Sequence, residues 1–140
     1  MIGNLHLQNK AYRPARKSFE KVLEQKRHDT YALCNCGNLC LVFARGDQPN
    51  RGLHFSRAIE YFCKTLSLDP SNMHAACGIA IAYAEVGKFQ EARDVFNQIH
   101  ELSGGDIRIA INAGQVFIEL GQILPAIALV FHFFTFSFNV

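Results

Sequence analysis

Large and small apolar residues recur along the chain at a spacing of 34 residues, except across one insertion of nine residues at 45–53. A column of alanines is followed four residues later by a column of large side chains, which places both columns on the same face of a helix. A third column of small residues precedes the alanines. The three columns are Ala15, Ala58, Ala92 and Ala126; Phe19, Phe62, Phe96 and Val130; and Gly3, Gly37, Ala80 and Gly114.

This periodicity predicts pairs of antiparallel helices. Small residues let the helices of a pair approach closely, and the large residues fill the gap to the next pair, so that no unit buries its apolar face alone. We expect N-caps at Ser71 and Asp106. The breaks are expected at Lys10/Ala11, 45–52, Asp69-Pro70, Gly87, Gly104-Gly105 and Gly121. The predicted helices span 1–9, 12–25, 29–44, 53–67, 71–86, 89–102, 106–120 and 124–136.

A 34-residue period with these columns resembles the tetratricopeptide repeat. Its cleanest copy is 73–106, with the turn at Gly87, and the preceding copy closes with Asp69-Pro70. The resemblance implies an all-α fold, a right-handed superhelical solenoid of antiparallel helix pairs. We expect about four repeats over 1–130, with the first and last incomplete. The chain is therefore interpreted as a fragment of a longer repeat protein.

Three segments carry a more specific resemblance: 1–7, 29–33 followed by Gly37-Asn38, and 87–96. Together they are similar to the tetratricopeptide-rich scaffold subunit of the RNA polymerase II-associated factor complex, over about residues 1–128. That resemblance implies a non-enzymatic nuclear scaffold. It would hold the other subunits of the complex on the RNA polymerase II elongation machinery, and so support transcription elongation and histone modification. It carries over no catalytic residue and no cofactor.

The C-terminal residues 131–140 depart from the family pattern. They are rich in Phe, and no Asp, Glu, Lys or Arg follows Glu119. We interpret this tail as aberrant or unstructured sequence, such as a mis-spliced end. One alternative is a membrane-tethered adaptor, because 123–140 is marginally long enough to span a bilayer. The pattern also leaves open a cytosolic peptide-binding adaptor and the recognition arm of a larger enzyme.

The resemblance to tetratricopeptide proteins also implies which residues line the inner groove of the superhelix. Such a wall could bind an extended peptide or a partner helix. The alternative is that missing parts of the same protein cover it. The candidate partner-binding residues are Asn4, Tyr31, Asn38, His74, Ile81, Glu85, Arg108 and Gln115.

The sequence offers little support for a carboxylate clamp, a zinc site or a catalytic site. Chaperone-binding repeat proteins use Lys and Arg to hold a terminal carboxylate, but here those positions hold Cys34, His74, Cys77 and Gly78. Cys36 and Cys40 share a helix face away from Cys34, so we expect core thiols and no zinc site. No phosphate loop or nucleophile motif is present. We therefore predict no catalytic residue, metal, cofactor or small-molecule substrate.

Composition and charge refine this picture only slightly. The 140 residues are 49% hydrophobic and 19% charged with a net charge of +2, which excludes a disordered or collagen-like chain and does not favour direct nucleic-acid binding. The charge is uneven, since 1–27 carry seven Lys or Arg against two Glu. The odd cysteine count and the lack of a signal-peptide pattern suit reduced thiols inside the cell.

Overall fold

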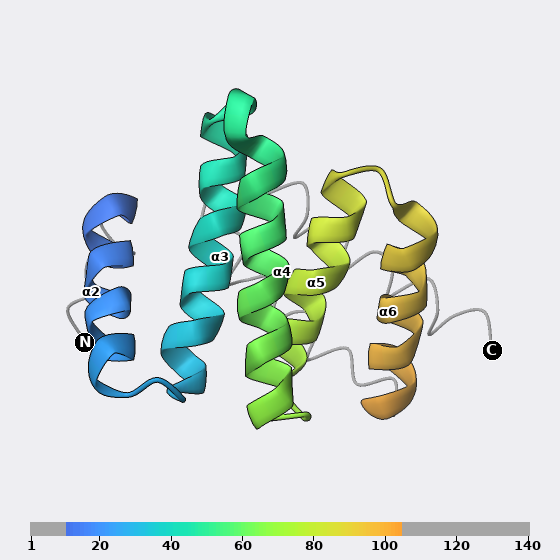
Figure 1. Cartoon of the computed structure of the whole chain (residues 1–140). Coiled ribbons are helices and arrows are strands. Elements are labelled where there is room, and N and C mark those ends of the chain that lie inside the picture. The colour runs from blue at the N-terminus through green and yellow to red at the C-terminus, as the bar shows by residue number, and fades with distance from the viewer. Residues whose placement is uncertain (1–10, 105–140) are drawn as a thin grey trace.

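The computed structural model describes residues 11–104, and within that part of the chain every regular element is helical (Figure 1). The elements lie side by side in chain order, and each α-helix packs against its neighbour in the sequence. The helices are α2 (Tyr12–Gln25), α3 (Thr30–Gly46), the 3-10 helix η1 (Gln48–Asn50), α4 (Arg51–Leu68), α5 (Met73–Glu85) and α6 (Phe89–Leu102).

The predicted helices over this range are confirmed, with one difference at the insertion. The sequence predicts a loop at 45–52, but α3 runs to Gly46, η1 occupies Gln48–Asn50 and α4 begins at Arg51. The inserted residues thus mainly lengthen two helices, and α3 and α4 extend past their neighbours at the top of Figure 1. Between them, the Asp47 carboxylate accepts hydrogen bonds from Asn50 Nδ2 and interacts with His54 Nε2 at 3.0 Å.

Side chains cap the N-termini of α3 and α5. Asp29 Oδ1 accepts a hydrogen bond from the backbone N–H of Ala32 at 2.8 Å. Asn72 Oδ1 does the same for Ala75 at 3.0 Å. The N-cap predicted at Ser71 is wrong by one residue, because the Ser71 hydroxyl donates instead to Asp69 Oδ1 and leaves the capping position to Asn72.

Two of the predicted glycine turns are confirmed by their backbone geometry. Gly87 has φ +82° after α5, and Gly104 has φ +63° after α6. Both lie in the left-handed region that ends a helix, where a residue with a Cβ would be strained. At Gly87, Lys88 N–H donates to Tyr83 O, which closes the turn that reverses the chain into α6.

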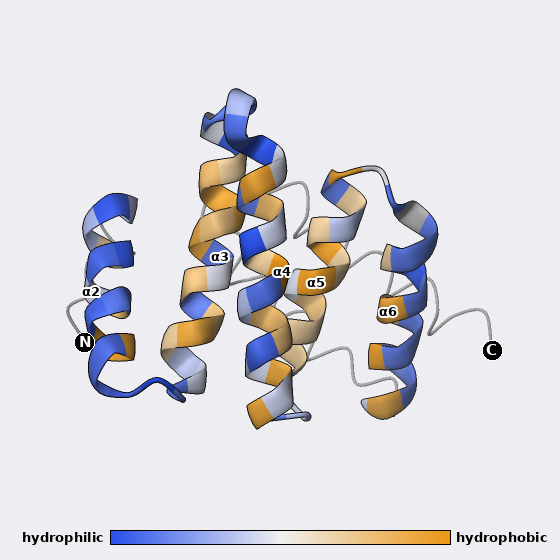
Figure 2. Ribbon diagram, viewed as in Figure 1, coloured by the Kyte–Doolittle hydropathy of each residue, from blue (hydrophilic) through white to orange (hydrophobic). Residues whose placement is uncertain are grey.

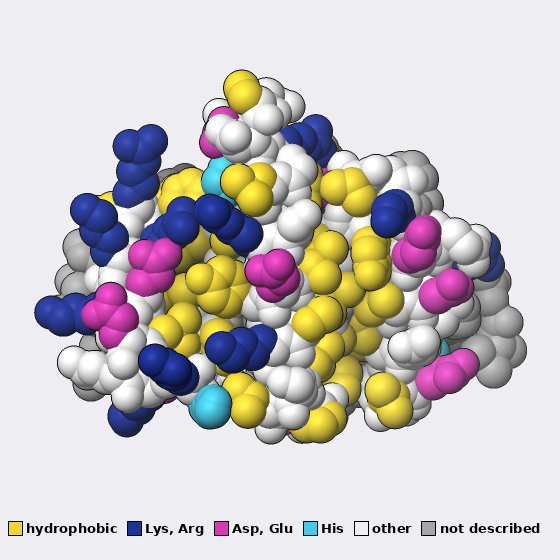
Figure 3. Space-filling model, in the orientation of Figure 1, with side chains coloured by type: hydrophobic (Ala, Val, Ile, Leu, Met, Phe, Trp, Pro, Cys, Tyr) yellow, Lys and Arg dark blue, Asp and Glu magenta, His cyan; other side chains and the backbone are white. Residues whose placement is uncertain are grey.

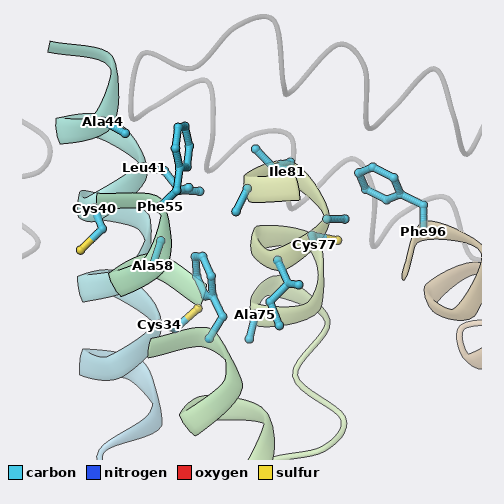
Figure 4. Close-up of a cluster of buried hydrophobic side chains, with 14 of the residues drawn as sticks. Cys34, Cys40, Leu41, Ala44, Phe55, Ala58, Ala75, Cys77, Ile81 and Phe96 are labelled. Carbon is cyan, nitrogen blue, oxygen red and sulfur yellow. The ribbon is translucent and has the colours of Figure 1, made fainter. Parts of the chain in front are cut away.

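The repeat columns form the core. Ala15, Ala58 and Ala92 are buried, as are the large residues four positions further on, Phe19, Phe62 and Phe96. Figure 4 shows side chains of α3, α4 and α5 converging between the helices, with Phe96 reaching toward them from α6. Within residues 11–104, the structure therefore confirms that neighbouring helix pairs bury their apolar faces against each other.

One aromatic ring joins two repeats at the centre of this core. Phe62 on α4 is fully buried. A Cβ placed on Gly37 of α3 would lie 2.7 Å from its Cε1 atom, and a Cβ placed on Gly78 of α5 would contact its Cζ atom even more closely. The ring therefore occupies space that both glycines leave by having no side chain.

The hydropathy of each helix differs between the inner and the outer positions of the stack. α3 and α5 are apolar on most of their surface, whereas α2 and α6 carry narrow apolar stripes and expose polar faces (Figure 2). This distribution is typical of inner and outer helices. Among residues 11–104, no helix combines the length and the apolar character that crossing a membrane requires.

Several sequence predictions fall outside the described residues. They are the helices at 1–9, 106–120 and 124–136, the cap at Asp106, the break at Gly121, and the Phe-rich segment 131–140 with its membrane alternative.

Candidate functional site

The candidate inner wall is formed by α3 and α5, which pack against each other although a complete helix, α4, separates them in the chain. Five of the eight predicted partner-binding residues lie on these two helices. Asn4, Arg108 and Gln115 lie outside the described residues. The five that the structure places are Tyr31, Asn38, His74, Ile81 and Glu85.

Two of these five side chains are buried among their neighbours. Asn38 is 6% exposed and Ile81 is 3% exposed. They contribute to the packing of α3 and α5 and offer little surface to a partner. Asn35, which lies one turn before Asn38, donates from Nδ2 to the Tyr31 carbonyl at 2.9 Å.

Tyr31 and His74 are the two exposed residues among the five, and each lies in the first turn of its helix. Tyr31 is 58% exposed, and its ring meets the Phe19 ring edge-on with centroids 6.2 Å apart. His74 is also exposed, but the surrounding protein removes enough water from its ring to lower its pKa. The lowered pKa favours a neutral imidazole, which can both donate and accept hydrogen bonds.

Glu85 forms ion pairs with two arginines of the preceding repeat. Its carboxylate pairs with Arg45 at 2.5 Å and with Arg51 at 3.3 Å, and Arg51 also donates to the Glu85 carbonyl at 2.9 Å. Arg45 belongs to the last turn of α3 and Arg51 is the first residue of α4, and both lie within the insertion at 45–53. The lengthened helices of one repeat therefore hold the C-terminal end of α5 in the next.

We expect Glu85→Gln to lower the free energy of unfolding by about 1 kcal/mol, since it removes the charge that two partly exposed arginines share. Urea denaturation followed by circular dichroism measures the change. Glu60→Gln is the matched control, because Glu60 is exposed on α4 and has no ion pair among residues 11–104. Equal stability of the two variants would contradict the interpretation of Glu85 as a joint between repeats.

The cysteines have the character of core residues. Burial raises the pKa of Cys34, Cys36 and Cys77 to about 12, and that of Cys40 to about 11. A thiol with so high a pKa is a poor nucleophile and a poor metal ligand at neutral pH. Within the part of the chain that the structure describes, no group of three or more His, Cys, Asp or Glu side chains is arranged to hold a metal ion.

We expect iodoacetamide to alkylate Cys63 first in the native chain. Cys63 is the exposed member of the five, and the other four are buried. Mass spectrometry after a short reaction at neutral pH should find the label at Cys63, with the remaining thiols reacting only in urea. Labelling of Cys36 or Cys77 at a comparable native rate would contradict the packing described above.

Comparison with curated proteins finds the same kind of protein repeatedly. RNA polymerase-associated protein CTR9 of Caenorhabditis elegans is 32% identical over 134 residues, covering 91% of this chain. Protein CTR9 homolog of Arabidopsis thaliana is 34% identical over 132 residues, covering 87% of this chain. The chain is similar to the CTR9 proteins over most of its length. The CTR9 protein of Saccharomyces cerevisiae agrees, with 27% identity over 117 residues.

The similarity to CTR9 concerns one segment of a much longer protein. The chain spans 12% of the length of the worm and plant CTR9 proteins and 11% of that of the yeast CTR9 protein. No family model matches the chain. The resemblance to the polymerase-associated scaffold subunit is confirmed at the level of sequence similarity.

Solved structures show the fold. TTC0263, a TPR protein of Thermus thermophilus, superposes with a TM-score of 0.69 at 13% identity, covering 91% of this chain and 66% of that one. YrrB, described as a TPR protein with an unusual peptide-binding site, gives a TM-score of 0.59 at 20% identity, covering 94% of this chain and 63% of that one. The all-α tetratricopeptide fold of this chain is thereby confirmed.

Sequence analysis did not single out Arg45 and Arg51. Their spacing to Glu85 gave no signal, because Arg51 lies in the insertion and begins α4, whereas Glu85 ends α5. The pair joins the start of one helix to the end of another, a contact between repeats that depends on how the helices stack.

Proposed function

We propose that this chain is part of a non-enzymatic scaffold that holds partner proteins in an RNA polymerase II-associated factor complex. The similarity to CTR9 proteins over 91% of the chain carries the proposal. In this view the protein acts in the nucleus, supports transcription elongation and histone modification, and binds other subunits of the complex and the polymerase machinery.

The described residues support such a role in two ways. The helices stack into an array in which Phe62 and the bridge at Glu85 connect successive repeats, and a connected array keeps its binding surfaces in a fixed relation. Exposed Tyr31 and His74 on the α3 and α5 wall offer an aromatic ring and a neutral imidazole, both suited to contacting another protein. Tyr31, Asn38, His74, Ile81 and Glu85, with Asn4, Arg108 and Gln115, remain proposed partner-binding positions.

Affinity purification of the full-length parent protein tests this proposal. We expect RNA polymerase II and its associated factors to be recovered from nuclear extract, and recovery to persist after nuclease treatment because the contacts are between proteins. An untagged strain is the control. Recovery of chaperones or membrane proteins in place of the polymerase-associated factors would overturn the proposal and favour an adaptor.

A further inference from the structure

A cleft lies between α2 and α4, with a face of α3 as its floor. α2 and α4 each pack against α3. In Figure 3 the surface between them is hollowed, and hydrophobic side chains are visible at its base. We call this the α2–α4 cleft and define it by the half-buried rings of Phe43 on α3 and Tyr61 on α4, and by the cations Arg16 and Arg57 at its rim.

The floor is apolar and only partly covered. Phe43 and Tyr61 are half-buried and pack on the small core cluster that α2 and α3 form. The pKa of the Tyr61 hydroxyl is raised, mainly by desolvation and then by the neighbouring Cys36. The guanidinium of Arg16 stands over the Phe43 ring, 5.8 Å from its centroid. Aromatic rings that remain partly open beside cations are typical of anchor pockets at protein interfaces.

Cations border this floor on both helices. Arg57 and Lys64 are exposed and flank Tyr61 at helical spacing on α4. Arg16 and Arg57 lower the pKa of Cys40 and Glu20 raises it, against the stronger effect of burial, so these three charged groups lie near Cys40. Figure 3 shows Lys and Arg side chains gathered over α2 and the adjoining edge of α4.

These cations are only partly neutralised. Arg16 pairs with Glu20 at 2.7 Å. Among residues 11–104, no carboxylate pairs with Arg57 or Lys64. α2 and α4 together carry seven Lys or Arg against three Glu, whereas α6 at the other end of the array carries three acidic residues and one Arg. Arg57 and Lys64 therefore leave positive charge beside the cleft that no described carboxylate neutralises, although the net charge of the chain is small.

We propose that the α2–α4 cleft binds an acidic segment of a partner protein, which inserts an apolar side chain between the helices and pairs its carboxylates with the rim. This inference rests on the proposed scaffold role. The charge of the rim selects an acidic occupant, and the apolar floor calls for an aliphatic or aromatic anchor.

A nucleic acid fits the cleft less well than an acidic peptide. Glu20 stands beside Arg16, and Glu60 lies between Arg57 and Lys64 on α4. Carboxylates at these positions repel an unbroken row of phosphates. A peptide can place its own carboxylates opposite the cations and leave neutral residues opposite Glu20 and Glu60.

Fluorescence anisotropy with the full 140-residue chain tests this inference. The probe is a labelled peptide in which glutamates flank a single leucine. We expect saturable binding that weakens with added salt. Arg57→Glu combined with Lys64→Glu should weaken it about tenfold, because two favourable charge contacts become repulsive. Replacing the leucine of the peptide by serine should also weaken binding, with no change to the protein.

Arg93→Glu is the matched control, since Arg93 is exposed on α6 and receives the same charge reversal away from the cleft. We expect it to change peptide affinity by less than about twofold. Equal weakening by Arg93→Glu would overturn the inference. So would a labelled single-stranded RNA that binds more tightly than the peptide. The peptide assay reports on the cleft alone, and recovery of the factors with the parent protein reports on the scaffold role, so either can fail separately.

Discussion

Phe62→Ala should lower the free energy of unfolding by about 3 to 5 kcal/mol, the range for truncating a fully buried aromatic side chain. Phe62 fills the space between α3, α4 and α5, so its loss opens a cavity where two repeats meet. Neither Gly37 nor Gly78 has a side chain that could move into that cavity. Because small domains are stabilised by only about 5 to 15 kcal/mol, we expect the urea midpoint to fall sharply.

Cys63→Ala is the control for this prediction. Cys63 is the next residue on α4 and is exposed, so that variant should unfold within about 0.5 kcal/mol of the original chain. A Phe62→Ala chain that loses less than about 1 kcal/mol would contradict the placement of the ring at the junction of the repeats.

Gly78→Ala should destabilise the chain by about 1 to 3 kcal/mol, although alanine is the better helix former. The added Cβ would run into the Phe62 ring, which is itself fixed by the core and cannot swing away. Thermal unfolding followed by circular dichroism measures the loss.

A control variant and a compensating substitution test whether the contact with Phe62 causes this loss. Gly52→Ala is the matched control, because Gly52 lies in the first turn of α4 and a Cβ there meets nothing within 4 Å. That variant should be neutral or slightly more stable. Phe62→Leu in the Gly78→Ala chain should recover part of the loss by making room. Equal effects of Gly78→Ala and Gly52→Ala would exclude the close contact.

The spacing of apolar residues predicted most of the fold. The alanine and phenylalanine columns indicated which face of each helix is buried, and Gly87 marked the turn between α5 and α6. The importance of Gly78 could not be read in this way. It stands two residues before the column that contains Ala80, and only the position of the Phe62 ring shows that the space is needed.

The predicted helix ends were wrong at two places, the start of α5 and the insertion. Ser71 and Asn72 are both residue types that favour the N-cap position. The Ser71 hydroxyl donates a hydrogen bond to Asp69, and Asn72 caps the helix. At the insertion, polar and glycine-containing sequence predicted a loop. In the structure, Arg45 and Arg51 lie in helices and pair with Glu85. This contact between repeats cannot be predicted from the local sequence.

The candidate site was predictable only as a set of positions. The repeat register places Tyr31, Asn38, His74 and Ile81 on the two helices of the inner wall, but it does not say how far neighbouring side chains cover them. Asn38 and Ile81 are buried while Tyr31 and His74 are exposed. The cleft between α2 and α4 escaped the sequence analysis because its rim and floor come from three helices.

Cross-linking mass spectrometry of the purified full-length parent protein tests the central claim most directly. Lys17, Lys64 and Lys88 are exposed on α2, on α4 and at the turn before α6, and so report on the surface of this segment. The scaffold role predicts amine cross-links from these lysines to other subunits of an RNA polymerase II-associated complex. Recovery of those subunits with cross-links only to other parts of the parent, or cross-links only to unrelated chaperones, would contradict it.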